Sequence, residues 1–278
     1  ISNRLVVKEN TVAKPIDISS LKISDVNNDK DKSEDLRAAL FGNKTAYQVV
    51  AAQSGYMAHV APLGYSDIVS IYYSTLDTLE YQKLLYKTLH DKILKTSVGR
   101  LGYSDFLNST SVEDVETLYY GLYMSTFQND GMFRYKCPKC GEEHDYKIDN
   151  RTLIGASDNA AMMERTSMIR KNPSRESMEA LSLLNDRPGI ELTKSKLVIE
   201  LRTPSLSNSL EMLATVPEDE IEKSEMSATI MLYINRVLIP NPRTKQYHSE
   251  SNRKAILRMV EALDIDDARE LELAITKR

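Results

Sequence analysis

The cysteine content of the chain restricts what can hold its fold together. Cys137 and Cys140 are the only cysteines in 278 residues, and they stand three positions apart. Small domains of oxidising compartments rely on several spaced disulfides, and a single C-x-x-C pair cannot supply that framework. We therefore expect a fold held by a hydrophobic core, with the chemistry of the chain centred on this pair.

Apolar periodicity predicts that most of the chain is helical. Leu84, Leu85, Leu89 and Ile93 recur at the spacing of a helix face. A second stripe runs from Val112 to Tyr123, and Ser111 before it can accept from free N–H groups of the first helical turn. Further helices are predicted within 150–185, with a break at Asn172-Pro173, and at about 224–238, 249–263 and 266–276, the second of these three capped by Ser249.

Shorter apolar runs predict strands among these helices. The runs at 46–52 and 56–60 flank Gly55 and suggest a hairpin. Lys196 to Leu201 reads as the clearest strand, and Pro204 after it suits the first turn of a helix, where no N–H is needed. The predicted class is therefore α+β and predominantly helical, with short β-hairpins, one of them a zinc-ribbon-like knuckle.

Three regions are predicted along the chain. Residues 1–32 form an extended arm, because the polar run from Ser24 to Lys32 has little to bury. Residues 33–155 form a helical region with the Cys-pair hairpin, and residues 156–278 form a C-terminal α/β region that is mainly helical. No internal repeat is apparent, and no stretch approaches the ~20 apolar residues of a membrane span.

The segment Cys137-Pro138-Lys139-Cys140-Gly141 predicts a metal knuckle. Strand-like residues precede it at Met132–Tyr135 and follow it at His144–Ile148, as in half of a zinc ribbon. Two thiolates at this spacing can clasp one zinc ion, and glycine permits the tight turn. A structural zinc site needs four ligands, however, and the chain has only two cysteines.

Three interpretations of this deficit stay open. His144 can supply a third ligand, with His59, His90 or His248 as a fourth. A second copy or another protein can contribute ligands across an interface, so that the zinc is shared with a partner chain. The turn can also hold no metal. A redox dithiol is disfavoured, because such pairs begin a helix and here strand-like residues lie on both sides. The predicted site is Cys137, Cys140 and His144, with zinc.

No pattern of residues predicts an enzyme. Glycine-rich phosphate loops, a nucleophile elbow and a zinc-protease motif are all absent from the sequence. The acidic runs Glu218–Glu220 and Asp264–Asp267 are typical of helix starts and solvated faces. We expect no catalytic residues and no small-molecule substrate. The net charge of −4 also disfavours general binding of nucleic acid, which needs a cationic surface.

Several segments of the chain carry a resemblance to one protein family. In the first half they are Thr45 to Tyr65, Ser104 to Leu107, Ser111 to Phe127 and Cys137 to Gly141. In the second half they are the strand that ends at Thr203-Pro204, the run Tyr233 to Val237, and a helix with Leu257, Val260 and Leu263. Together these segments resemble the baseplate hub and hub assembly proteins of contractile-tailed, T-even-like bacteriophages. The resemblance spans Ala46 to Ile275 and does not include the arm at Ile1 to Lys32.

The resemblance implies a structural or assembly role in the tail baseplate. It implies a protein of the virion, assembled in the host cytoplasm, with other baseplate or tail proteins or other copies of itself as partners, and with no catalytic residues. The Cys pair is the recurrent chemical feature of that family. The alternative is a zinc-ribbon accessory module of a transcription or nucleic-acid-processing complex, where C-P-x-C-G turns are common. The basic residues around the turn are offset by Glu142, Glu143 and Asp145, and this charge balance argues against the nucleic-acid alternative.

Overall fold

The computed structural model of the chain describes residues 46–127, 131–149, 160–216, 221, 225–241, 243–244 and 246–276. Helices alternate there with small antiparallel sheets, which confirms the mixed and mainly helical class. The predicted arm at 1–32 lies outside these ranges. No helix within them is both long enough and apolar enough to cross a membrane.

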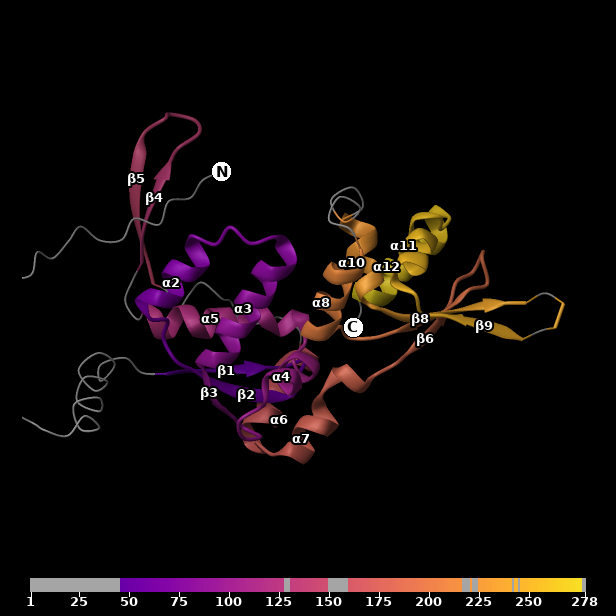
Figure 1. The fold of residues 1–278 in the computed structure, drawn as a ribbon, viewed down its shortest axis with the longest axis horizontal. Coiled ribbons are helices and arrows are strands. Elements are labelled where there is room, and N and C mark those ends of the chain that lie inside the picture. The colour runs from indigo at the N-terminus through magenta and orange to yellow at the C-terminus, as the bar shows by residue number, and fades with distance from the viewer. Residues whose placement is uncertain are drawn as a thin grey trace, which may run out of the picture.

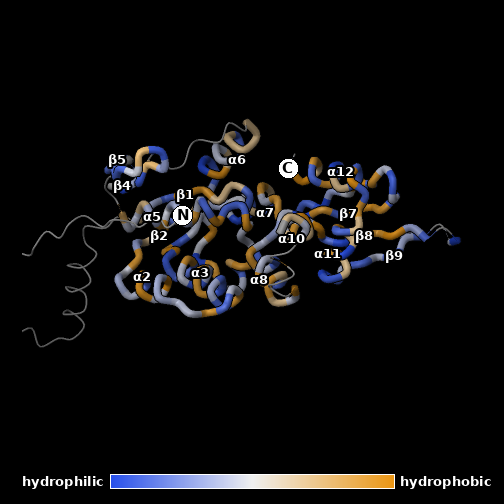
Figure 2. Tube along the Cα trace, turned by 90° about the horizontal axis from the view of Figure 1, so that it is seen from above, coloured by the Kyte–Doolittle hydropathy of each residue, from blue (hydrophilic) through white to orange (hydrophobic). Residues whose placement is uncertain are grey.

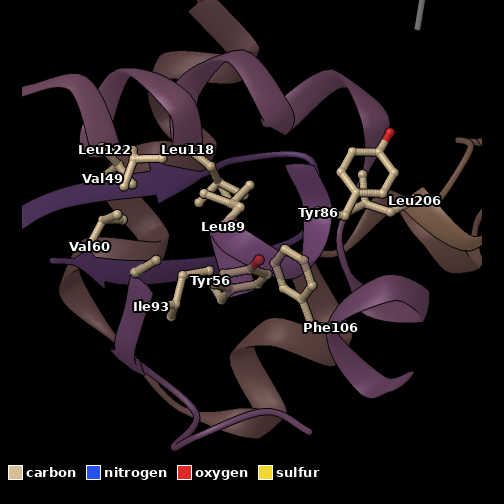
Figure 3. Close-up of a cluster of buried hydrophobic side chains, with 12 residues drawn as sticks. Val49, Tyr56, Val60, Tyr86, Leu89, Ile93, Phe106, Leu118, Leu122 and Leu206 are labelled. Atoms are coloured by element: carbon tan, nitrogen blue, oxygen red, sulfur yellow. The ribbon is translucent and has the colours of Figure 1, made fainter. Parts of the chain in front are cut away.

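The first unit is a three-stranded sheet covered by helices. Its strands β1 (Tyr47–Ala51), β2 (Tyr56–Val60) and β3 (Ile93–Thr96) pair antiparallel in that order. Its helices are α2 (Tyr65–Tyr72), α3 (Thr78–Lys92), α4 (Tyr103–Ser109), the short 3-10 turn η2 (Val112–Asp114) and α5 (Val115–Thr126). Figure 3 shows its core, where side chains from β1, α3 and α5, such as Val49, Leu89 and Leu118, meet. The helices α3 and α5, which the two apolar stripes predict, pack against each other in this core.

A connecting region follows the first unit. It holds the strands β4 (Gly131–Lys136) and β5 (Glu143–Ile148), which pair only with each other among the described strands, as Figure 1 shows. After them come α6 (Ala160–Lys171), α7 (Arg175–Leu181) and the 3-10 turn η4 (Leu183–Asn185). The break predicted at Asn172-Pro173 is confirmed between α6 and α7.

The second unit has a four-stranded antiparallel sheet and its own core. The strands β6 (Gly189–Glu191), β7 (Val198–Leu201), β8 (Ile234–Pro240) and β9 (Tyr247–Glu250) pair in that order. The helices are α8 (Leu206–Thr215), α10 (Glu225–Leu232), α11 (Arg253–Glu261) and α12 (Ile265–Thr276). Buried residues such as Leu192, Ile234 and Leu271 form the core. The two units lie end to end along the long axis in Figures 1 and 2.

The two units are copies of one fold. Each runs strand, strand, helix, helix, strand, helix, helix, with the strand β9 added after β8 in the second copy. In each copy the second strand pairs with the third through a register shift. Val60 pairs with Ile93 in the first copy, and Leu201 pairs with Ile234 in the second. The equivalent residues of the two pairs are separated by 141 positions in the sequence, 60 from 201 and 93 from 234. The expectation of no internal repeat was therefore wrong.

Backbone hydrogen bonds repeat with the same shift. Ala61 N–H donates to Lys92 O at 2.7 Å, and its counterpart Arg202 N–H donates to Tyr233 O at 2.8 Å. The turn between the first two strands also repeats, with a positive φ of 83° at Gly55 and 58° at Lys196. A hydrogen-bonding pattern this similar shows a structural duplication even though few side chains are identical.

Four local predictions are corrected by the structure. The helix predicted at 224–238 ends at Leu232, because Ile234 to Pro240 pairs as the central strand β8. Ile93 likewise starts a strand and does not end a helix. Ser249 lies in β9, and the cap of α11 is Asn252, which accepts from Ala255 N–H at 3.2 Å. Pro204 stands one residue before the capping Ser205, outside the first turn of α8.

The helix α8 joins the two copies. It contacts α3 and α4 of the first copy as well as α10 and α11 of its own. Leu206 is fully buried within the first core, whereas Met212 packs against the second. The two copies are therefore held together by a helix that serves both cores.

Candidate metal centre

The β4–β5 hairpin carries the residues that the sequence predicts as a metal site. Its two strands pair in a continuous register from Gly131 opposite Ile148 to Lys136 opposite Glu143. Six residues at the tip, 137–142, connect them. The hairpin projects from the first copy in Figure 1, and its tip side chains face solvent. The predicted hairpin around the Cys pair is therefore confirmed.

Backbone hydrogen bonds hold the tip in a compact turn. Cys137 N–H donates to Glu142 O, and Gly141 N–H donates to Cys137 O, both at 2.8 Å. Gly141 has a φ of +75°, a conformation that strains residues with a Cβ. The glycine after the second cysteine thus permits the turn that brings residue 142 back toward residue 137.

Three donors gather on the outer side of this turn. Ligand atoms of Cys140, Glu142 and His144 all lie within 4.8 Å of one another, and the three side chains are exposed. The Sγ of Cys140 and the Nε2 of His144 are 4.0 Å apart. Zinc bonds of about 2.3 Å to sulfur and 2.0 Å to nitrogen place tetrahedral ligand atoms roughly 3.5 Å apart. The observed separation is close enough for small side-chain rotations to complete that geometry.

Cys137 lies next to this trio but is not part of it. Backbone N–H groups of Cys140 and Lys139 donate to its sulfur and, with the Cys140 side chain, hold the pKa of the Cys137 thiol below its ordinary value. Amide groups aimed at a sulfur favour the thiolate, which is the form that binds metal. The turn is thus arranged to stabilise a negative sulfur at Cys137.

The predicted ligands are brought together only in part. Cys140 and His144 meet, and Glu142 joins them in place of Cys137. Glu142 was missed by the sequence analysis. No signal in the sequence separates Glu142 from Glu143, because the turn at Gly141 decides which carboxylate faces the thiol.

The other three histidines serve elsewhere. His90 Nε2 lies 3.0 Å from Leu101 O, and His248 Nε2 lies 3.2 Å from the side-chain nitrogen of Asn241. His59 is on β2, opposite Lys95. None of the three belongs to the cluster of donors at the hairpin tip, so the interpretation that one of them is the fourth ligand gains no support.

Charges along the hairpin are paired below the tip. The Nε of Arg134 lies 3.0 Å from Asp145 Oδ1 and 3.9 Å from Glu143 Oε2. Hydrogen bonding from Arg134 lowers the pKa of Asp145, although burial acts slightly against it. Tyr135 and Tyr146 are exposed on the same hairpin. The hairpin therefore presents aromatic rings and metal donors to solvent, while Arg134 is engaged with the two acids beside it.

No protein-family model, curated protein or solved structure matches this chain. The resemblance to baseplate hub proteins therefore stays a prediction. A thiolate, an imidazole and a carboxylate form a donor set that suits a zinc ion.

Proposed function

We propose that this chain is a structural assembly protein whose β4–β5 hairpin docks onto a neighbouring protein through a zinc ion. The observation that carries the proposal is the trio Cys140, Glu142 and His144 at the exposed tip of a projecting hairpin. Three donors leave one of the four zinc positions for a side chain of the neighbour, and Cys137 beside them takes it in the isolated chain.

The position of the site favours docking over a role in stabilising the fold. Both hydrophobic cores, as far as the structure describes their side chains, form from other segments of the chain. The free energy of zinc binding, on the order of 10 kcal/mol in structural sites, is then available to an interface. The exposed rings of Tyr135 and Tyr146 suit the same role, since tyrosine is enriched at interfaces.

The setting we propose is the tail baseplate of a contractile bacteriophage. This part of the proposal is supported by the resemblance over Ala46 to Ile275, and it needs no catalytic group. The alternative module of a nucleic-acid complex is disfavoured by Arg134, because its guanidinium is paired with Asp145 and Glu143 and less free to contact phosphate.

Zinc content of the purified full chain tests the metal site. We expect one zinc per chain after loading and dialysis, measured by elemental analysis. Cys140→Ser and Glu142→Gln should lower this content, whereas Glu143→Gln, which changes an adjacent exposed acid outside the trio, should not. Equal zinc content in Glu142→Gln and Glu143→Gln would show that Glu142 is not a zinc ligand.

A genetic experiment tests the setting. In the phage genome that encodes the chain, Cys140→Ser should leave incomplete tails that electron microscopy detects, while Glu143→Gln should give normal particles. An antibody to the chain should label the baseplate end of intact tails or of their assembly intermediates. Normal tails with Cys140→Ser would contradict the docking role of the hairpin.

A further inference from the structure

The duplication contains an interface between its two copies. Leu206, at the first position of α8, is fully buried beside Tyr86 and Phe106 of the first copy, as Figure 3 shows. Its backbone N–H donates to Thr110 O at 2.9 Å. The first copy thus has a socket, made by α3, α4 and the segment after α4, that receives the start of a helix from the second copy.

The helix of the first copy that corresponds to α8 has no such socket among the described residues. The shift of 141 positions relates Leu206 to Tyr65, the first residue of α2. Tyr65 is 84% exposed, and α2 contains no buried residue. Ile68 and Tyr72, on the same helix face at spacings of three and seven residues, are also exposed.

The second copy carries a surface that corresponds to the socket. Its α10 and α11 occupy the places of α3 and α4, and α12 begins where η2 begins in the first copy. In the first socket, Val112 N–H donates to Pro204 O at 2.9 Å. Beyond the third strand the two copies are offset by 153 positions, as Asp114 and Asp267 are. The corresponding residue in the second copy is therefore Ile265, which is 64% exposed. Met226 on α10 is 69% exposed. Among the residues that the structure describes, an exposed face of α2 and exposed apolar side chains at Met226 and Ile265 thus stand near the places that the α8 contact fills in the first copy.

We propose that α2 of one chain docks onto the α10–α11 surface of a second copy of this chain. The contact repeats between molecules the contact that α8 makes within one molecule. It joins two different surfaces head to tail, so successive chains form a closed ring or an open filament. Apolar surface that is exposed on terminal copies of a repeat is otherwise covered by polar capping residues, and Tyr65, Tyr72 and Ile265 are not such residues.

We choose a second copy as the occupant because the chain itself contains both the α2 face and the surface that corresponds to the socket. The α8 contact shows that the start of this helix fits this socket in the first copy, and the duplicated backbone repeats both parts. Neither the zinc donors nor the hairpin takes part, so this proposal stands apart from the proposed function.

The test measures association of the full chain in a chelating buffer, which removes any contribution from zinc. We expect the molar mass from sedimentation or light scattering to rise with concentration up to about 100 μM, a range that detects micromolar affinity. Tyr65→Asp should keep the chain monomeric, and so should Ile265→Asp. Met163→Asp is the matched control. Met163 is also exposed, and it lies on α6, opposite α2 in both Figure 1 and Figure 2.

Mixing the two variants provides the decisive measurement. The Tyr65→Asp chain keeps its socket and the Ile265→Asp chain keeps its α2 face, so an equimolar mixture should give a heterodimer and nothing larger. Circular dichroism checks that both variants stay folded. A wild-type chain that is monomeric throughout overturns the proposal, since another segment or protein then covers α2. Association that survives both substitutions, or a mixture without heterodimer, overturns it too.

Discussion

Asp114 and Asp267 are equivalent residues that tie the first turn of each copy to its last helix. Each carboxylate accepts hydrogen bonds from two successive backbone N–H groups, those of Gln53 and Ser54 in the first copy and of Lys194 and Ser195 in the second. Both residues are buried, and the donor pairs again differ by 141 positions. This bond joins segments that are some 60 or 70 residues apart in each copy.

The two carboxylates nevertheless differ in their acidity. Burial raises the pKa of Asp114 to about 6, against hydrogen bonds from Ser54 and Gln53 that lower it. Burial acts in the same direction on Asp267, but the hydrogen bonds from Lys194 and Ser195 and the Lys194 charge hold its pKa below the ordinary value. Burial outweighs the hydrogen bonds at Asp114, whereas the hydrogen bonds and the Lys194 charge outweigh burial at Asp267. The same bond therefore carries opposite pH dependence in the two copies.

Asp114→Asn should remove a pH dependence from the stability of the chain. Between the ordinary pKa of aspartate near 4 and the folded value of about 6, the folded state binds more protons than the unfolded state. The free energy of unfolding therefore falls as pH rises through this window. We expect wild type to lose about 3 kcal/mol relative to Asp114→Asn between pH 4 and pH 7, measured by urea denaturation. Parallel curves for the two proteins would show that Asp114 does not titrate in this window.

Leu118→Ala and Leu271→Ala should damage one copy each. The two leucines are fully buried at equivalent places, four residues after Asp114 and Asp267. Removing either side chain leaves a cavity, with an expected loss of about 2–5 kcal/mol. Native-state hydrogen exchange should locate the loss in 47–126 or in 189–276. Leu273→Ala is the control, because Leu273 on the same helix is exposed and its change should stay within about 0.5 kcal/mol.

Gly55→Ala should be more destabilising than Gly99→Ala. Both glycines have a positive φ, so alanine is strained at either position, by about 1–2 kcal/mol. A Cβ at Gly55 would lie 2.8 Å from the backbone oxygen of Met178, whereas a Cβ at Gly99 meets nothing within 4 Å. We expect this clash to add roughly 1–3 kcal/mol at Gly55, measured by thermal or urea unfolding. Equal losses would show that α7 moves away without cost.

Removal of zinc should change the hairpin and little else. The far-UV circular dichroism of the helices should be the same with and without chelator, because the core residues that the structure describes come from elements other than β4 and β5. Alkylation of Cys137 and Cys140 should be slow in the zinc-loaded chain and fast in the stripped chain, as read by mass spectrometry. Loss of helical signal on chelation would show that the metal supports the fold.

Much of the fold could be predicted from local patterns. The hairpin of β1 and β2, the helix after Ser111, the break at Pro173 and the strands around the Cys pair all follow from residues close in sequence. Prediction was wrong where burial in a sheet outweighed helical spacing. Ile234 to Pro240 has apolar residues that suit either structure, and its pairing with β7 and β9 makes it a strand.

The candidate metal site was likewise predicted only in part. Cys140 and His144 were predicted from spacing and chemistry, and the structure brings them together. The sequence could not indicate whether Glu142 or its neighbour Glu143 is the third donor, because both are glutamates. The path of the turn decides between them, because it points one carboxylate toward the thiol and pairs the other with Arg134.

By itself the sequence determined the class of the fold, the hairpin and its cysteine turn, since these depend on periodicity, capping and turn residues within a few positions. Only the tertiary structure decided that the chain is a duplication and that Asp114 and Asp267 are equivalent. A repeated fold requires that strand pairing and burial repeat, but most side chains can differ. Ala58 and Ile199, for example, are buried at equivalent positions of their sheets although their side chains differ in volume. The contacts that define the repeat join residues far apart in the chain, where sequence spacing carries no signal.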